Sequence, residues 1–404
     1  MKTNILKHIN PVTIIALITA LAVVNQAITL QTFDLGILYY GVLIFALFVT
    51  FFQSTIKRIS MTMAILYIAC ILSILLNDIP TVYQPWMRFS LFTIVTIIAS
   101  PFIQSDFYDK FRVTIFKYIH SLLILVIIIS IPFIISGKKG LAGFSGFTNH
   151  SMLLAPISAV TLITLLYLLF KGTYNRIIVI SLIIITFITL LLAASRVSLA
   201  GAIIAVIYFF YRLYSNNKRK FATIAISIIV LMTLSYPLWG SYMEGIEKKN
   251  QAQVTETGEI NYTGSRDVLW QQRIREFNSS PLVGVGFGFA EYVTDINERT
   301  GRITYKKTET GTVEPGSSWL GALSMTGLLG FTALLVLWFK SLKNCWRVEK
   351  RDKLYGVYIG STLIFWAVHM IAEGQIFAAG SFLFFMVWIT FGAAYSAYNV
   401  AYKR

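Results

Sequence analysis

The stretch GSRDVLWQQRIREFNSSPLVGVGFG, residues 264–288, stands near the centre of a long polar insert that runs from about residue 240 to residue 316. Apolar segments long enough to cross a membrane precede and follow this insert, and most of the remaining chain is apolar. The polar groups that can do chemistry are therefore expected in the insert and at the helix ends that face it. The chain divides accordingly into residues 1–239, 240–316 and 317–404.

The composition of the chain indicates a membrane protein. Hydrophobic residues make up 56% of the 404 residues and charged residues only 13%, whereas a soluble protein carries roughly a quarter charged residues. Apolar runs of about 20 residues recur, which predicts an all-α polytopic membrane protein. Twelve spans are expected, at residues 11–30, 35–52, 61–76, 89–103, 113–136, 151–170, 177–194, 197–211, 221–239, 318–339, 354–371 and 376–400.

The formal net charge of +16 suggests a nucleic-acid partner only if membrane topology is ignored. Most of the Lys and Arg residues of the short loops fall on one side of the predicted membrane, and such loops are cytoplasmic by the positive-inside rule. Both termini are therefore expected in the cytoplasm and the long insert outside. The charge is explained by topology, and no nucleic acid is expected as a partner.

The insert is expected to hold a helix at residues 266–277. Four side chains with i, i+4, i+7, i+11 spacing share one face of it: Arg266, Trp270, Arg273 and Phe277. One interpretation is an amphipathic helix on the outer membrane surface, with its aromatic residues at the interface. The other is that the arginines hold a lipid-linked phosphate, because a guanidinium binds phosphate oxygens bidentately. Arg196, expected at the outer boundary between the seventh and eighth spans, favours the phosphate.

Two features follow this helix. Glycines alternate with apolar residues at 282–289, but no Walker lysine and no strand-to-helix context accompany them, so a nucleotide loop is not expected. A tight turn that lets the backbone approach a ligand is the better explanation. Glu314 then precedes the tenth span. It either interacts favourably with the helix dipole or acts as a general base on a sugar hydroxyl.

The histidines are scattered, and no His/Cys cluster has metal-ligand spacing, so neither a metal nor another cofactor is expected. His150 begins the sixth span from the outside, beside Asn149, as an interfacial polar residue or as a substrate contact. His369 and Glu373 are one helical turn apart at the outer end of the eleventh span. They form either a hydrogen-bonded pair or part of a substrate site.

Three groups of residues together resemble the O-antigen ligase and polymerase superfamily of bacterial membrane glycosyltransferases. They are Ala194-Ser195-Arg196 at the start of a span, residues 266–288 with the sequence SPLVGVG, and MTGLLG at 325–330. Their order around one large outer loop makes the resemblance specific, and it extends over the whole architecture. It implies a GT-C-like fold and metal-independent transfer of a glycan from undecaprenyl diphosphate at the outer face of the inner membrane. It also implies that Arg196 and Arg266 bind the diphosphate leaving group.

The chain departs from the family pattern at one place. Family ligases carry a His-Asn pair just before the span that follows the large loop, where this chain has Gly316-Ser317-Ser318-Trp319. Glu314 lies close enough in sequence to substitute for the histidine. The departure favours a polymerase of O-antigen, capsular or exopolysaccharide repeats over a ligase that transfers glycan to lipid A core or protein. The implied partners are lipid-linked donor and acceptor glycans, membrane lipid, a chain-length regulator and a flippase.

A transporter of the lipid-linked repeat is a further interpretation. Coupled transporters usually carry ionisable groups near the bilayer centre, where the expected spans are almost uncharged, and internal repeats common in transporters are not visible. The sequence therefore predicts a membrane polysaccharide polymerase with Arg196, Arg266 and Glu314 as catalytic residues. The predicted substrate contacts are Arg273, His150, Asn149, Trp270, Ser317, His369 and Glu373.

Overall fold

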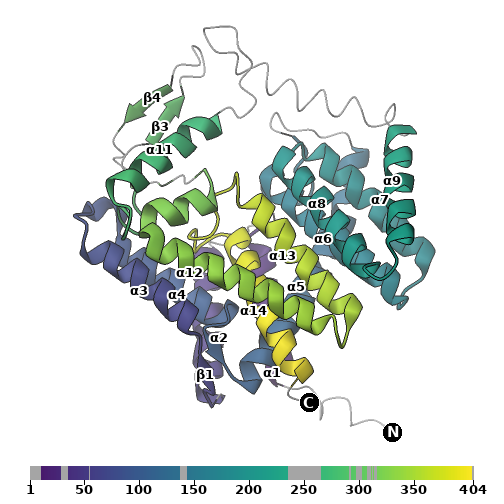
Figure 1. Cartoon of the computed structure of the whole chain (residues 1–404), viewed down its shortest axis with the longest axis horizontal. Helices are drawn as coiled ribbons and strands as arrows, with labels where there is room; N and C mark the ends of the chain where they lie inside the picture. Colours follow the sequence, from purple (N-terminus) through teal and green to yellow (C-terminus); the bar gives the residue numbers. More distant parts are fainter. Residues whose placement is uncertain are drawn as a thin grey trace.

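The computed structural model describes residues 11–28, 35–53, 55–136, 143–234, 265–290, 293–296, 303–306, 311, 313 and 316–402. Most of these residues are helical (Figure 1). The helices are α1 (Pro11–Asn25), α2 (Leu35–Gln53), α3 (Met61–Leu75), η2 (Thr81–Tyr83), α4 (Pro85–Ala99), α5 (Asp106–Ile135), α6 (Ser151–Lys171), α7 (Arg176–Leu192), α8 (Arg196–Leu213), α9 (Lys218–Leu234), α11 (Ser265–Ser279), α12 (Ser318–Val348), α13 (Lys353–His369) and α14 (Phe382–Tyr402). Two antiparallel strand pairs join β1 (Arg58–Ile59) to β2 (Ile103–Gln104) and β3 (Val293–Ile296) to β4 (Ile303–Lys306).

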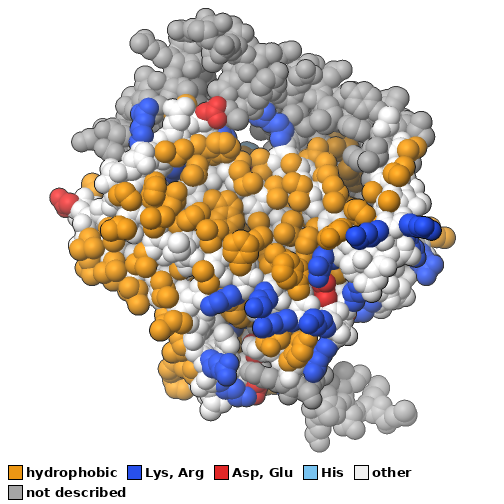
Figure 2. All heavy atoms as spheres, viewed as in Figure 1, with side chains coloured by type: hydrophobic (Ala, Val, Ile, Leu, Met, Phe, Trp, Pro, Cys, Tyr) orange, Lys and Arg blue, Asp and Glu red, His pale blue; other side chains and the backbone are white. Residues whose placement is uncertain are grey.

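Among the residues that the structure describes, five helices are long and apolar enough to cross a membrane, namely α5, α6, α8, α12 and α14, and shorter apolar helices accompany them. Large apolar side chains such as Phe48, Phe52 and Ile177 are exposed on the outside of the bundle, where lipid would cover them. Figure 2 shows a broad hydrophobic band with many Lys and Arg side chains below it. The prediction of an all-α membrane protein is confirmed, and the number of twelve spans stays a prediction.

Several helix ends differ from those expected. The fourth helix begins at Pro85 rather than at residue 89, because proline suits the first helical position. The last helix begins at Phe382 rather than at residue 376, because the preceding residues form a loop that is hydrogen-bonded to the start of α12. The α12 helix, expected as the tenth span at residues 318–339, continues to Val348. The loop before α14 is part of the candidate site described below.

The bundle is assembled from antiparallel pairs, such as α12 with α3, α13 with α8 and α14 with α5, and from parallel pairs, such as α14 with α12 and with α4. At one end of the bundle Arg212 of α8 pairs with Glu349 after α12 at 2.6 Å, and Asn399 of α14 donates to Asp109 of α5 at 3.2 Å. The candidate site lies at the opposite end, where α11 rests on α12 (Figure 1).

A break in α12 holds the glycine-rich segment 281–288 in place. Gly327 has φ 60° and ψ −166°, a backbone conformation that is open essentially to glycine alone. The Leu328 N–H beyond the break donates to the Pro281 carbonyl at 2.8 Å. A Cβ at Gly327 would lie 2.3 Å from the Leu282 carbonyl oxygen. The close backbone approach expected from the glycines is therefore made to α12.

Candidate functional site

Arg266, near the start of α11, reaches across to the loop between α13 and α14. Its Nη2 donates to Glu373 Oε1 at 2.9 Å, and the two side chains are 22% and 21% exposed. An ion pair that is partly buried is screened less by salt than one on the surface. The two predicted site residues are thus brought together, and each remains accessible to a charged ligand.

Buried polar groups accompany this ion pair. His369, the last residue of α13, interacts electrostatically with Arg266 and Gln375, and His369 and Gln375 are 1% and 3% exposed. Apart from the interaction between these two side chains, His369 Nδ1 and both amide atoms of Gln375 have no hydrogen-bond partner within the described part of the chain. Because unpaired buried polar atoms are costly, these groups indicate a place that a polar ligand or water completes.

Two serines at the start of α12 fix the loop that carries Glu373. Ser317 is the N-cap of α12 and its Oγ donates to the Met370 carbonyl at 3.3 Å. Ser318 Oγ donates to the Glu373 carbonyl at 2.6 Å and accepts from the Gln375 N–H at 2.9 Å. Ser317 is 1% exposed, and its contacts make it a residue that positions this loop.

Arg196 is the first residue of α8 and follows the N-cap Ser195. Its side chain is exposed. The α8 helix runs along α13 so closely that a Cβ at Gly201 would lie 3.1 Å from the Phe365 ring. The two helices are antiparallel, so the start of α8 lies beside the end of α13. Arg196 begins α8, and Glu373 follows shortly after the end of α13. Arg196 therefore lies at the same end of the bundle as the ion pair between Arg266 and Glu373.

The α11 helix is covered by protein on one face. That face, which packs towards α12, carries residues at most 6% exposed, namely Leu269, Gln272, Arg273 and Glu276. Arg273 Nη1 donates to Glu276 Oε2 at 2.7 Å, so a neutralising carboxylate one turn away makes the buried charge tolerable. The structure therefore buries Arg273 in the protein, where it pairs with Glu276. The helix packs on α12, and both interpretations of it, as a helix on the membrane surface and as a phosphate site, stay predictions.

Three other predicted site residues make hydrogen bonds at the ends of helices or between connecting segments. Trp270 Nε1 donates to the Gly316 carbonyl at 3.2 Å, which joins α11 to the start of α12. His150 is the N-cap of α6, with Nδ1 accepting from the Met152 N–H at 3.1 Å. The Asn149 N–H donates to a carbonyl at the end of α1 at 3.0 Å. The side chains of Asn149 and His150 are exposed. The predicted base, Glu314, lies outside the described residues.

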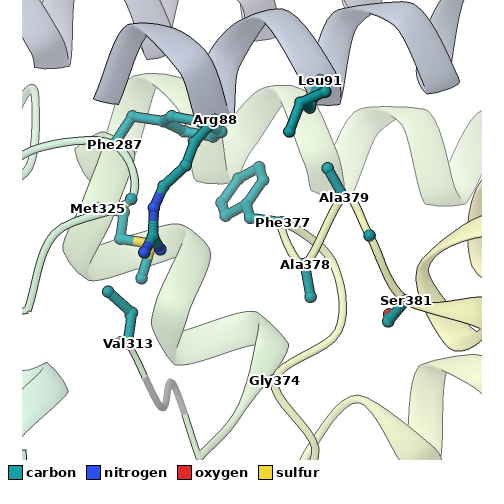
Figure 3. A pocket seen from close by; sticks show the side chains of 12 residues that line it. Arg88, Leu91, Phe287, Val313, Met325, Gly374, Phe377, Ala378, Ala379 and Ser381 are labelled. Carbon is teal, nitrogen blue, oxygen red and sulfur yellow. The ribbon is translucent and has the colours of Figure 1, made fainter. Parts of the chain in front are cut away.

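A cavity of about 300 Å³ lies on the other side of the same loop. Its walls come from α4, the glycine-rich segment, α12 and the residues before α14, and Figure 3 shows the guanidinium of Arg88 pointing into it. Arg88 Nη2 donates to the Gly311 carbonyl at 2.7 Å. The other lining residues are mostly apolar or glycine: Leu91, Phe287, Gly288, Val313, Met325, Gly374, Phe377, Ala378, Ala379, Gly380 and Ser381.

Sequence reasoning missed Arg88. The available signal was its place in a short connector on the predicted outer side, where basic residues are uncommon. The described residues contain no group of three His, Cys, Asp or Glu side chains that could hold a metal ion. The groups described at this end of the bundle therefore include several arginine side chains, the carboxylates that pair with Arg266 and Arg273, and buried polar atoms.

The helices and these charged groups define a multi-pass membrane protein with several arginine side chains gathered at one end. Residues 180–335 match the family model Wzy_C, described as O-Antigen ligase. This match supports the resemblance of this region to the O-antigen ligase and polymerase superfamily. The matched region extends from α7 into α12 and contains Arg196 and Arg266, whereas Arg88 and Glu373 lie outside it. No curated protein matches the chain.

Proposed function

We propose that this protein is a membrane glycosyltransferase that polymerises undecaprenyl-diphosphate-linked oligosaccharide repeat units into O-antigen, capsular or exopolysaccharide. The reaction takes place at the outer face of the bacterial inner membrane, with both termini in the cytoplasm. A hydroxyl of the acceptor repeat attacks the anomeric carbon of the donor glycan. The bond from that carbon to the diphosphate oxygen breaks, and undecaprenyl diphosphate leaves. No metal or nucleotide takes part.

The observation that carries this proposal is the position of Arg196 and Arg266. Both fall within the region that matches the O-antigen ligase family, and both lie at one end of the bundle. In the proposed mechanism their guanidinium groups stabilise the charge that develops on the departing diphosphate. The diphosphate competes with Glu373 for Arg266, because carboxylate and phosphate oxygens bind the same guanidinium edge.

The acceptor hydroxyl must lose a proton. Glu314 or His369 is proposed to take it, and His369 is the one of the two whose surroundings are described. It is buried beside Arg266 and Gln375. Burial and the charge of Arg266 keep the imidazole neutral, and a neutral imidazole nitrogen can accept a proton. The start of α12, with its serine hydroxyls hydrogen-bonded to the loop, supplies no histidine.

A ligase is the second candidate, because the matching family model is described as O-Antigen ligase. A ligase would transfer one finished glycan to lipid A core or to a protein, whereas a polymerase adds repeats one after another. The distribution of product sizes separates the two reactions. The His-Asn pair of the family ligases is missing at residues 316–319, which favours the polymerase.

The test uses purified protein in lipid with the host's lipid-linked repeat unit, and products are resolved by size. The variants Arg196→Ala and Arg266→Ala are each expected to lower kcat by about a hundredfold to a thousandfold, as the loss of a preorganised charge-stabilising donor does. Arg275→Ala is the matched control, because Arg275 is an exposed arginine on the same helix as Arg266. Normal rates in Arg266→Ala would remove Arg266 from the mechanism.

A further inference from the structure

We propose that the cavity beside Arg88 binds the diphosphate of the second lipid-linked substrate, the acceptor repeat unit. The proposal rests on the proposed function, because only a polymerase needs two lipid-linked diphosphates at once. It assigns the donor diphosphate to Arg196 and Arg266 and the acceptor diphosphate to Arg88. The ligand chemistry is a phosphate group carried by a membrane lipid.

The charge of Arg88 is the first reason. In the described part of the chain, Arg266, Arg273 and Arg212 each pair with a carboxylate, whereas the one contact found for the Arg88 guanidinium is the neutral Gly311 carbonyl at 2.7 Å. This contact uses one of its five N–H donors. None of the described residues that line the cavity is acidic. A half-buried guanidinium whose described neighbours in the cavity carry no negative charge favours an anion there.

The shape of the surroundings is the second reason. A volume of about 300 Å³ is at the lower end of the range for small-molecule sites, which suits a head group rather than a whole oligosaccharide. Gly380 and Ser381 of the lining precede α14, so the positive end of a long helix is directed towards the same space. Gly288 leaves room for the arginine, since a Cβ there would lie 2.8 Å from Arg88 Cδ.

The position relative to the membrane is the third reason. Trp86 and Met87, in the same helical turn as Arg88, are 49% and 53% exposed. Tryptophan is enriched at the membrane–water interface. An exposed tryptophan in this turn is typical of the level at which the phosphate of a membrane lipid lies.

The two sites are adjacent. Glu373 binds Arg266, and the next residue, Gly374, lines the Arg88 cavity. One loop thus separates the donor site from the acceptor site. This arrangement suits a transfer in which a sugar hydroxyl on one lipid must reach the anomeric carbon on another, because holding both reactants in place lowers the entropic barrier.

The test measures binding, so that it does not depend on catalysis. Full-length protein in nanodiscs of neutral phosphatidylcholine is mixed with undecaprenyl diphosphate, and native mass spectrometry counts the bound molecules. The expected result is two molecules on the wild-type chain and one on Arg88→Gln, with affinity at the lost site reduced by about tenfold or more. The glutamine keeps an amide donor for Gly311, and the melting temperature of each variant checks its folding.

A second variant and a control complete the test. Ala379→Phe fills the cavity without changing its charge and is expected to reduce the count to one as well, while Arg275→Ala keeps two. A single bound molecule on the wild-type chain, or two on both Arg88→Gln and Ala379→Phe, would overturn the proposal. Displacement of the second molecule by phosphatidylglycerol at equal concentration would also overturn it, because the site would then belong to a membrane phospholipid.

The assignment to the acceptor is tested with a labelled donor oligomer and a separate lipid-linked acceptor repeat. Arg88→Gln is expected to raise the acceptor KM by about tenfold and to leave the donor KM unchanged. An increase in the donor KM alone would overturn the assignment. If no transfer occurs in the wild-type protein, the proposed function fails, while the binding count still decides whether Arg88 holds a lipid phosphate.

Discussion

Replacing Gly327 with alanine is expected to destabilise the protein by about 3 to 5 kcal/mol. A non-glycine residue in the backbone conformation of Gly327, φ 60° and ψ −166°, costs about 1 to 3 kcal/mol. The new Cβ would lie 2.3 Å from both the carbonyl carbon and oxygen of Leu282. Relief of that clash moves the segment 281–288 away from α12.

Moving this segment breaks the two shortest of its backbone hydrogen bonds to α12. They run from the Leu328 N–H to Pro281 at 2.8 Å and from the Val285 N–H to Ser324 at 2.9 Å. Each contributes about 1 kcal/mol, which gives the rest of the expected loss. Because Phe287 of this segment lines the Arg88 cavity, the variant is also expected to lose transferase activity.

Two glycines elsewhere separate the causes. Gly172, the C-cap of α6, has φ 69° with no atom within 4 Å of an added Cβ, so Gly172→Ala measures backbone strain alone, about 1 to 2 kcal/mol. Gly41 in α2 has the same free space and no positive φ, so Gly41→Ala is expected to be neutral or stabilising. Melting temperatures in one lipid should fall in the order Gly41→Ala, Gly172→Ala, Gly327→Ala. Equal melting temperatures for Gly172→Ala and Gly327→Ala would refute a steric clash between the new Cβ at position 327 and Leu282.

Two further variants address the charged pairs. Glu373→Gln removes a negative charge beside the proposed diphosphate site on Arg266, so the donor KM is expected to fall by about fivefold, from about 1 kcal/mol of repulsion; a rise in KM would mean that Glu373 instead positions the arginine. Burial raises the pKa of Glu349, against the opposing effect of Arg212. A folded-state pKa above the unfolded value gives stability that is lost as the pH rises. The quantity to measure is the melting temperature of the wild-type protein minus that of Glu349→Gln. This difference is expected to decrease as the pH rises from about 4 to about 7. A difference that stays constant over this pH range would contradict the raised pKa.

The helices could be predicted from the sequence more completely than their ends. The sixth helix was expected at residues 151–170 and spans Ser151–Lys171, because a His-Ser cap precedes a long apolar run and Gly172 ends it. The start of α14 could not be predicted in this way. Apolar residues from Ile376 continue the hydrophobic pattern, yet hydrogen bonds from Ser318 keep them in a loop, and such tertiary contacts leave no periodic signal.

The candidate site was predicted in part for a similar reason. Arg266 and Glu373 were both identified, but their pairing joins two segments far apart in the chain. Arg273 has the same residue type and face spacing as Arg266, and only its burial against Glu276 distinguishes it. Arg88 is a single arginine in what the sequence predicts as a short connector, and the cavity that it faces is lined by residues from five segments. Sequence patterns report faces and caps, whereas these features depend on packing between segments.

The measurement that tests the central claim most directly is the reaction of purified protein in lipid vesicles with the undecaprenyl-diphosphate repeat unit, without metal or nucleotide. The expected result is a ladder of products that grows with time, with one undecaprenyl diphosphate released for each new linkage. The ladder should be absent for Arg196→Ala and Arg266→Ala and present for Arg275→Ala. A single transfer that requires added lipid A core or protein would show a ligase, and movement of the unchanged repeat unit across the bilayer would show a transporter; either result would contradict the proposed polymerase.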